Sequence, residues 1–186
     1  GNVTPLVSIE GLERVSDVRR GGRDVFSRTL GGLEACRRHR LITGVATSLC
    51  RSNIEDLLSA DFVHRLIDLR VHYLWYYVYR PVGPTPTPEL SLSAEQLRRA
   101  LRFIVRTRTW APLLIVDAYW DADGRPICPA AAGISYHVSP AGDVEPCPPI
   151  QFSADNVNNG RDIGDVIEGS TYLRGFRETA GRTTRG

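Results

Sequence analysis

Two cysteines, Cys128 and Cys147, are the residues of this sequence whose type and setting point most directly to chemistry. Apolar and polar residues alternate between them, and the turn sequence Ser-Pro-Ala-Gly-Asp follows at 139–143, so this segment predicts a β-hairpin that brings the two thiols close together. Prolines on both sides of Cys147 exclude a helix or a central strand there. A thiolate on such an irregular, exposed loop is suited to metal binding.

Other interpretations of the cysteine pair stay open. The two thiols could form a disulfide, bind zinc, or remain unlinked. A disulfide between Cys128 and Cys147 would close a loop of about 20 residues and contribute roughly 3 kcal/mol in the chain-entropy account. A zinc site would need four ligands, and near these cysteines only His137 offers one. Because two cysteines cannot complete a metal site, any such site needs ligands from elsewhere.

The composition of the chain is that of a globular protein. It has 186 residues, of which 42% are hydrophobic and 24% charged, enough for one core and an appendage. No apolar run approaches the ~20 residues of a membrane span, and no signal peptide is evident, so we expect a cytoplasmic protein without a membrane partner. A net charge of +2 gives no indication of nucleic-acid binding. Because methionine is absent, we expect a fragment of a longer protein.

Helical and extended patterns alternate along the first two thirds of the chain. Asn53 is placed to cap a helix that begins at residue 54, and Ser93 with Gln96 forms a capping box for a later helix. We assign the apolar face of that later helix to Leu97, Leu101, Ile104 and Val105. The predicted strands span 6–9, 41–49, 72–79 and 113–119, and the last is apolar enough to be buried on both sides.

This alternation predicts an α/β fold with a parallel sheet and right-handed crossovers. A complete eight-fold (β/α) barrel takes ~250 residues, so the chain has room for about half of one. Ligands of such sheets bind at the C-terminal ends of the strands. The candidates at these ends are Ser8, Glu10, Ser48, Asn53, Tyr79, Arg80 and Asp117, each of which also has a structural alternative.

Four segments together resemble the radical S-adenosylmethionine (radical SAM) superfamily, in particular members with a C-terminal SPASM-like auxiliary cluster region. They read VSIEGLERVSDVRRGG (7–22), GVATSLCRSN (44–53), YYVYRPVG (76–83) and CPAAAGISYHVSPAGDVEPC (128–147). The resemblance implies that residues 1–127 form the C-terminal half of a partial TIM-type barrel. Residues 128–186 would be the start of a small β-hairpin region that holds an auxiliary cluster.

The resemblance also implies a function and its cofactors. In this superfamily a 4Fe-4S cluster reduces S-adenosylmethionine, and the resulting 5′-deoxyadenosyl radical abstracts hydrogen from a substrate. An electron donor such as a flavodoxin or ferredoxin is implied as a partner, while the substrate, a small molecule or a peptide, stays open. The residues that match cofactor-binding positions are Ser8, Glu10, Arg19, Arg20 and Asn53, and those that match auxiliary iron-sulfur ligands are Cys128 and Cys147.

The sequence departs from the superfamily at its most characteristic motif. The CxxxCxxC loop that holds the radical cluster is absent from this chain, so we expect these residues alone to be inactive. The alternative is a non-catalytic half-barrel, a binding or carrier module that presents the cysteine hairpin.

Overall fold

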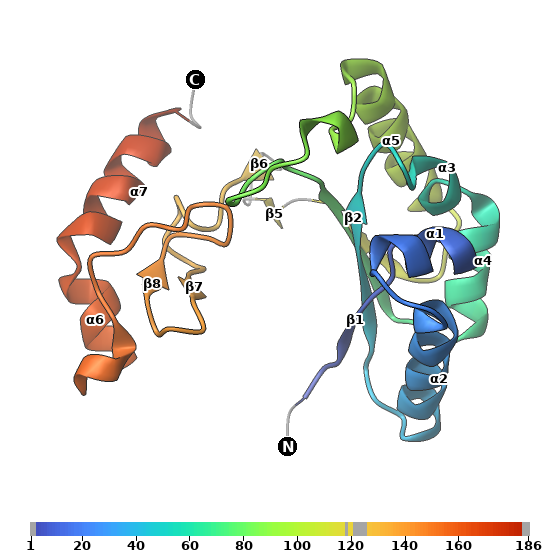
Figure 1. The fold of residues 1–186 in the computed structure, drawn as a ribbon, viewed down its shortest axis with the longest axis horizontal. Coiled ribbons are helices and arrows are strands. Elements are labelled where there is room, and N and C mark those ends of the chain that lie inside the picture. Colours follow the sequence, from blue (N-terminus) through green and yellow to red (C-terminus); the bar gives the residue numbers. More distant parts are fainter. Residues whose placement is uncertain (1–2, 118, 121–125, 184–186) are drawn as a thin grey trace. The chain divides into compact units, whose positions relative to one another are not determined.

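The computed structural model describes residues 3–117, 119–120 and 126–183. The chain divides into two compact units, 1–117 and 118–186, and each is described here by itself (Figure 1). We expected a boundary at 127/128 between a barrel segment and an auxiliary-cluster region. That boundary was drawn from a functional resemblance, and it stays a prediction.

A four-stranded parallel sheet forms the centre of the first unit, with its strands in the order β1-β2-β3-β4. Strands and helices follow one another along the chain, which confirms the α/β class and the parallel sheet expected from the sequence. The strands are β1 (Leu6–Ser8), β2 (Gly44–Leu49), β3 (Tyr73–Val78) and β4 (Leu114–Val116). The helices are α1 (Glu13–Arg19), α2 (Val25–Arg38), α3 (Ile54–Leu57), α4 (Ala60–Asp68), the short 3-10 turn η1 (Pro88–Leu90) and α5 (Ala94–Thr107).

Helices cover one face of this sheet (Figure 1). Val45, Leu74 and Ile115 lie side by side in neighbouring strands, and all three are buried in the core that the helices close. Successive residues of a strand point to opposite faces. The next register position, which includes Ala46 and Trp75, therefore faces the side away from these helices.

The one-sided cover corrects our expectation for the last strand. We predicted that residues 113–119 would be buried on both sides, but the side chain of Leu114 is 66% exposed. Only Ile115, on the helix side of β4, is buried within the strand. A continuous apolar run predicts burial on both faces only where both faces are covered.

The face assigned to α5 was also wrong in part. Its capping box is present, with the Ser93 hydroxyl accepting from the backbone N–H of Gln96. Ile104 is buried as expected, together with Ala100. The other apolar residues of the predicted face, Leu97, Leu101 and Val105, are exposed.

The second unit is built from short elements. Two antiparallel pairs form, β5 (Tyr119–Trp120) with β6 (Pro126–Ile127) and β7 (His137–Val138) with β8 (Val144–Glu145). A 3-10 turn, η2 (Val157–Asn159), and two helices, α6 (Ile163–Gly169) and α7 (Thr171–Thr183), follow. Its small core centres on Val144, Val166 and Leu173.

No helix among the described residues combines the length and apolar character needed to cross a membrane.

The close approach of β2 and β3 yields a test of the sheet. A Cβ on Gly44 would lie 2.1 Å from two ring atoms of Tyr73, so Gly44→Ala must displace that ring. We expect it to lower the free energy of unfolding in urea by about 1–3 kcal/mol. The matched control is Gly31→Ala in α2, where nothing lies within 4 Å of the added Cβ. There the change should raise stability by about 0.5–1 kcal/mol, and equal effects at both sites would contradict this packing.

Candidate functional site

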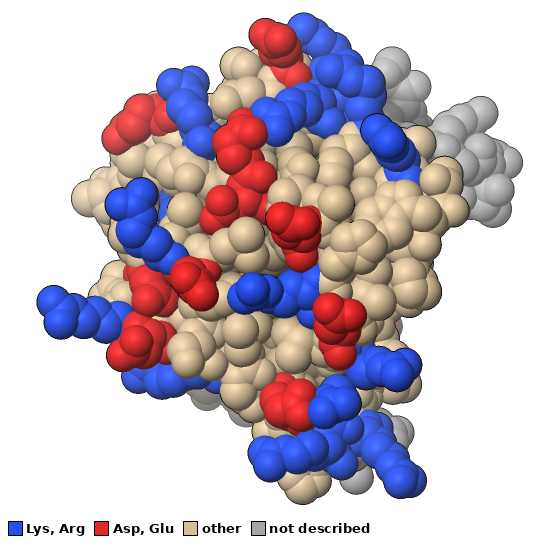
Figure 2. Space-filling model, turned by 90° about the vertical axis from the view of Figure 1, so that its right-hand side faces the viewer, with Lys and Arg blue, Asp and Glu red and all other residues tan. Residues whose placement is uncertain are grey.

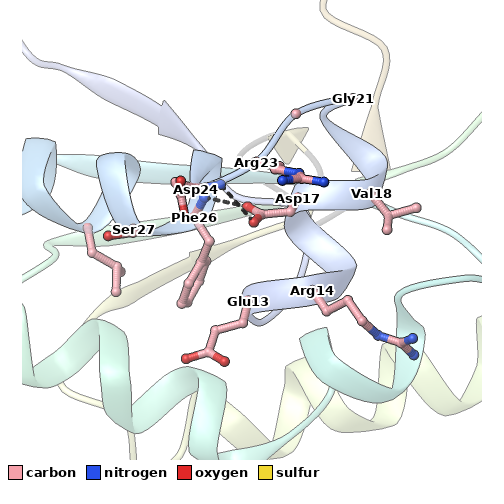
Figure 3. Close-up of a pocket in the computed structure, with 11 residues that line it drawn as sticks. Glu13, Arg14, Asp17, Val18, Gly21, Arg23, Asp24, Phe26 and Ser27 are labelled. Atoms are coloured by element: carbon pink, nitrogen blue, oxygen red, sulfur yellow. Dashed lines mark hydrogen bonds between the residues drawn. The ribbon is translucent and has the colours of Figure 1, made fainter.

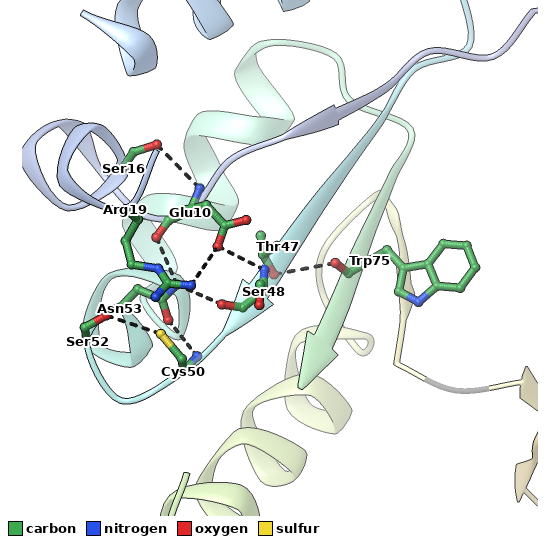
Figure 4. A network of polar contacts seen from close by, with 9 residues as sticks. All are labelled: Glu10, Ser16, Arg19, Thr47, Ser48, Cys50, Ser52, Asn53 and Trp75. Carbon is green, nitrogen blue, oxygen red and sulfur yellow. Dashed lines mark hydrogen bonds and ion pairs between the residues drawn. The ribbon is translucent and has the colours of Figure 1, made fainter. Parts of the chain in front are cut away.

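Glu10 occupies the centre of a polar network at the C-terminal edge of the sheet (Figure 4). It follows the end of β1 by two residues, and its side chain is buried. Its carboxylate accepts from the backbone N–H of Ser48 at 3.3 Å and lies 3.8 Å from a guanidinium nitrogen of Arg19. The backbone N–H of Glu10 donates to the hydroxyl of Ser16 at 3.4 Å. The network thus joins the end of β1 to the end of β2 and to α1.

Asn53 connects the C-terminal ends of β1 and β2 through hydrogen bonds of its side chain. Its side-chain oxygen accepts from the backbone N–H of Cys50 at 2.8 Å. Its amide nitrogen donates to the backbone carbonyls of Glu10 at 3.0 Å and Ser48 at 2.9 Å. Asn53 does stand at the N-cap position of α3, but its side chain makes no capping hydrogen bond, because its polar groups bind these backbone partners instead. The helix cap that we expected of it was therefore wrong.

Arg19 brings the positive charge of the site. It ends α1, a helix that the sequence analysis did not predict, and its side chain is largely buried. Its guanidinium carbon lies 5.9 Å from the centre of the Tyr79 ring. Its Nε is buried and has no hydrogen-bond partner among the described residues. A buried donor without a partner costs about 1–3 kcal/mol, so this nitrogen marks a place where a ligand acceptor would be favourable.

The electrostatics of Glu10 follow from its position. Burial raises its pKa above the ordinary value of 4.5, and this effect outweighs the Ser48 hydrogen bond and the charges of Arg19 and Arg20, which lower the pKa. The carboxyl group is thus costly to keep ionised without a further donor or cation.

Other candidates from the sequence lie outside this network. Ser8 is the last residue of β1 and is in register with Ala46, toward the side of the sheet away from the helices. Arg20, next to Arg19, is exposed, as is Arg80. Asp117 forms an ion pair with Arg108 at 2.5 Å, which supports the structural alternative for this carboxylate.

Two depressions lie around α1. The larger, about 660 Å³, is open and lies between α1 and α2 (Figure 3). At its wall the carboxylate of Asp17 accepts from the backbone N–H groups of Asp24 and Phe26, at 3.0 and 2.8 Å, and so holds the start of α2. The smaller, about 260 Å³, is lined in part by Arg19 and Ser52. Only the smaller depression reaches the Glu10 network, and we therefore take it as the approach to the candidate site.

The cysteine pair lies in the second unit. None of the cysteines in the described part of the chain forms a disulfide. The described residues contain no group of three or more His, Cys, Asp or Glu side chains placed to hold a metal ion. His137 pairs through Nδ1 with the buried carboxylate of Glu145 at 2.7 Å. These residues by themselves do not fit a complete zinc or iron-sulfur site.

Sequence reasoning identified Glu10, Ser48 and Asn53 as strand-end residues but missed how they are joined. It also missed Ser16, and it named both Arg19 and Arg20, of which only Arg19 forms an ion pair with Glu10 among the described residues. The sequence offers a Glu-Gly pair at 10–11, followed by a segment with few apolar residues. Neither feature indicates the helix α1.

The fold of the chain is similar to that of SuiB from Streptococcus suis. The crystal structure of SuiB matches with a TM-score of 0.71 at 14% sequence identity, covering 96% of this chain and 46% of that chain. SuiB bound to S-adenosylmethionine matches with a TM-score of 0.70 at 15% identity, covering 95% of this chain and 45% of that one. SuiB bound to the precursor peptide SuiA gives 0.68 at 14% identity, covering 95% and 44%.

The chain therefore spans less than half the length of these structures. The likeness shows a fold shared with SuiB, and it is consistent with the α/β fold that we expected from the sequence. The radical SAM membership of the chain and the SPASM-like identity of residues 128–186 stay predictions. No protein-family profile and no curated protein matches the sequence.

The raised pKa of Glu10 predicts how stability depends on pH. The folded state keeps the Glu10 proton to a higher pH than the unfolded state, whose value is near 4.5. The free energy of unfolding contributed by this group is thus full below that value and falls as pH rises through the folded pKa. In urea titrations from about pH 4 to about pH 8, Glu10→Gln should lack this fall. The exposed Glu13→Gln is the matched control, and a Glu10→Gln profile parallel to it would contradict the assignment.

Proposed function

We propose that this chain is part of a radical SAM enzyme that acts on a peptide, and that the Glu10 network binds S-adenosylmethionine. The observation that carries the proposal is the buried Nε of Arg19. This nitrogen has no hydrogen-bond partner among the described residues, and the guanidinium to which it belongs lies beside the Glu10 carboxylate. It lies at the C-terminal edge of a parallel sheet, where such sheets bind ligands. The fold shared with SuiB, a protein solved with S-adenosylmethionine bound, supports the same ligand.

Each residue of the network has a role suited to one part of this ligand. The planar guanidinium of Arg19 binds the carboxylate of the methionine part through two parallel hydrogen bonds. Glu10 accepts from the ligand's ammonium or ribose hydroxyl groups, which supply the donors that keep its carboxylate ionised. Asn53 acts as a positioning residue, because its side chain holds the backbone of Glu10 and Ser48. Ser8 and Arg20 are proposed as outer contacts of the same ligand.

The iron-sulfur clusters of the superfamily do not fit the residues present here. The chain has no CxxxCxxC loop, and two cysteines cannot complete a cluster. A radical cluster would supply the electron for cleavage of S-adenosylmethionine. Because this sequence lacks the CxxxCxxC loop, the ligands of that cluster would have to come from outside it. Cys128 and Cys147 are proposed as two ligands of an auxiliary cluster whose other ligands also come from outside this sequence. A flavodoxin or ferredoxin is proposed as the electron donor, and the cytoplasm as the compartment.

A peptide is the proposed substrate. SuiB has been solved with its precursor peptide SuiA, which supports this class. On β3 the rings of Trp75 and Tyr77 stack at 4.9 Å with an interplanar angle of 11°. By strand alternation they lie on the side of the sheet away from the helices, where their surface suits an apolar or aromatic peptide side chain.

The alternative is a non-catalytic half-barrel that binds a ligand or partner without radical chemistry. The absence of the three-cysteine loop from the sequence favours it. The two functions differ in what happens when the chain is combined with the missing cluster-binding half, because only the enzyme would then cleave S-adenosylmethionine.

Equilibrium dialysis with radiolabelled S-adenosylmethionine tests the proposal. The chain should bind the ligand, and Arg19→Ala should weaken binding by about tenfold or more, since a charge-assisted hydrogen bond contributes about 1.5–3 kcal/mol. The matched control is Arg38→Ala at the exposed end of α2, which should bind like the wild type.

Equal binding by Arg19→Ala and the wild type would contradict the assignment. With dithionite as reductant, the chain alone should release no 5′-deoxyadenosine. Its release would show that the missing cysteine loop is not needed, and would overturn our account of the cluster.

A further inference from the structure

Helix α5 exposes a stripe of three apolar side chains. Leu97, Leu101 and Val105 follow one another at intervals of four residues, so they form a line along the helix. Their exposed fractions rise along the line, at 37%, 45% and 59%. This is the drift expected of an i, i+4, i+8 row, which turns away from the buried side of the helix as it proceeds.

The stripe is not what holds α5 in the fold. Ala100, Ile104 and Thr107 are the buried residues of this helix, and Phe103 packs beside them. The helix is therefore attached to the core by a different face, and the apolar stripe remains in contact with water. Exposed apolar side chains are unremarkable when scattered singly, but a contiguous row rimmed by charge marks an interaction site.

Arginines border the stripe. Arg98, Arg102 and Arg106 each follow one stripe residue directly, so they form a parallel basic row, and none has an acidic partner within the described part of the chain. The other two arginines in this region differ, since Arg99 pairs with Glu55 and Arg108 with Asp117. Figure 2 shows several basic side chains along the upper part of the helical face, where Figure 1 places α5, with acidic side chains among them.

We infer that this α5 surface, formed by Leu97, Leu101 and Val105 with Arg98, Arg102 and Arg106, docks an acidic amphipathic helix of a partner protein. The three apolar residues span about 12 Å of helix, which matches partner side chains at i, i+4 and i+7. The three arginines, which have no acidic partner among the described residues, are complementary to carboxylates on that partner. The inference is independent of S-adenosylmethionine binding, because it involves none of the residues of the Glu10 network.

Two other kinds of partner fit this surface less well. Single-stranded nucleic acid binds where aromatic side chains accompany basic ones, whereas this stripe is wholly aliphatic. A membrane-surface helix has a broad apolar face that includes aromatic residues, while here the apolar row is one side chain wide. An acidic amphipathic helix complements both the apolar stripe and the basic row of α5.

The direct test is fluorescence anisotropy with a synthetic alanine-based helical peptide of about 14 residues that carries leucines at i, i+4 and i+7 and glutamates beside them. The chain should bind this peptide more tightly than a scrambled peptide of the same composition. Leu101→Glu should weaken binding by about tenfold or more, because it places a carboxylate among the carboxylates of the peptide. Val82→Glu, which changes an exposed apolar residue elsewhere in the first unit, is the matched control and should leave binding unchanged.

Charge reversal separates recognition from loss of structure. The double variant Arg98→Glu/Arg102→Glu should lose the glutamate peptide and bind the same peptide with lysines in place of glutamates. All these side chains are exposed, so thermal unfolding should stay close to that of the wild type.

Three results would overturn the inference. The first is binding of the designed and scrambled peptides with equal affinity, or binding that Leu101→Glu leaves unchanged. The second is a dimer in sedimentation that Leu101→Glu dissociates, which would make a second copy of this chain the occupant. The third is binding to vesicles of phosphatidylcholine and phosphatidylserine, but not to the peptide, which would assign the surface to a membrane.

Discussion

The candidate site depends on the hydrogen bonds that the side-chain amide of Asn53 makes to the backbone. The amide is buried, and a buried amide is tolerated only when its donors and acceptor are paired. Here the pairing is with three backbone groups, from Glu10, Ser48 and Cys50. These groups belong to the ends of two adjacent strands, so one side chain sets the separation of both ends. Each backbone group left without its partner would cost about 1–3 kcal/mol, which makes this geometry rigid.

The rest of the site follows from that fixed edge. With the backbone of Glu10 and Ser48 held together, the Glu10 carboxylate meets the Ser48 N–H, and α1 places Arg19 against the same carboxylate. The start of α1 is itself fixed from α3, where the Asp56 carboxylate accepts from the backbone N–H of Leu12 at 2.8 Å. Within the described first unit the helices pack on one face of the sheet (Figure 1), and the Glu10 network lies at the strand ends (Figure 4). This division between a packed face and a reactive edge links the fold to the proposed chemistry.

Local patterns in the sequence predicted the parts of the fold that local forces decide. The Ser93–Gln96 capping box depends on neighbouring residues alone, and each of the four strands carries a local apolar or β-branched pattern that sequence reading can detect. α1 was missed because its N-cap, Leu12, has no capping side chain and its carboxylate partner lies 44 residues away. The buried face of α5 was misassigned because its apolar residues form two rows, and periodicity cannot tell which row meets the sheet. The role of Asn53 likewise depends on partners brought close only by strand pairing, 43 residues away in the case of Glu10.

Residue-resolved hydrogen–deuterium exchange, with and without S-adenosylmethionine, tests most directly whether this strand edge is the binding site. The account predicts slower exchange at the backbone amides of Glu10, Ser48 and Cys50 and along α1 when the ligand is added, because binding at Arg19 and Glu10 holds these hydrogen bonds closed. It predicts no change between Cys128 and Cys147. Protection confined to that cysteine segment, or no protection at a saturating ligand concentration, would contradict the assignment of the Glu10 network as the S-adenosylmethionine site.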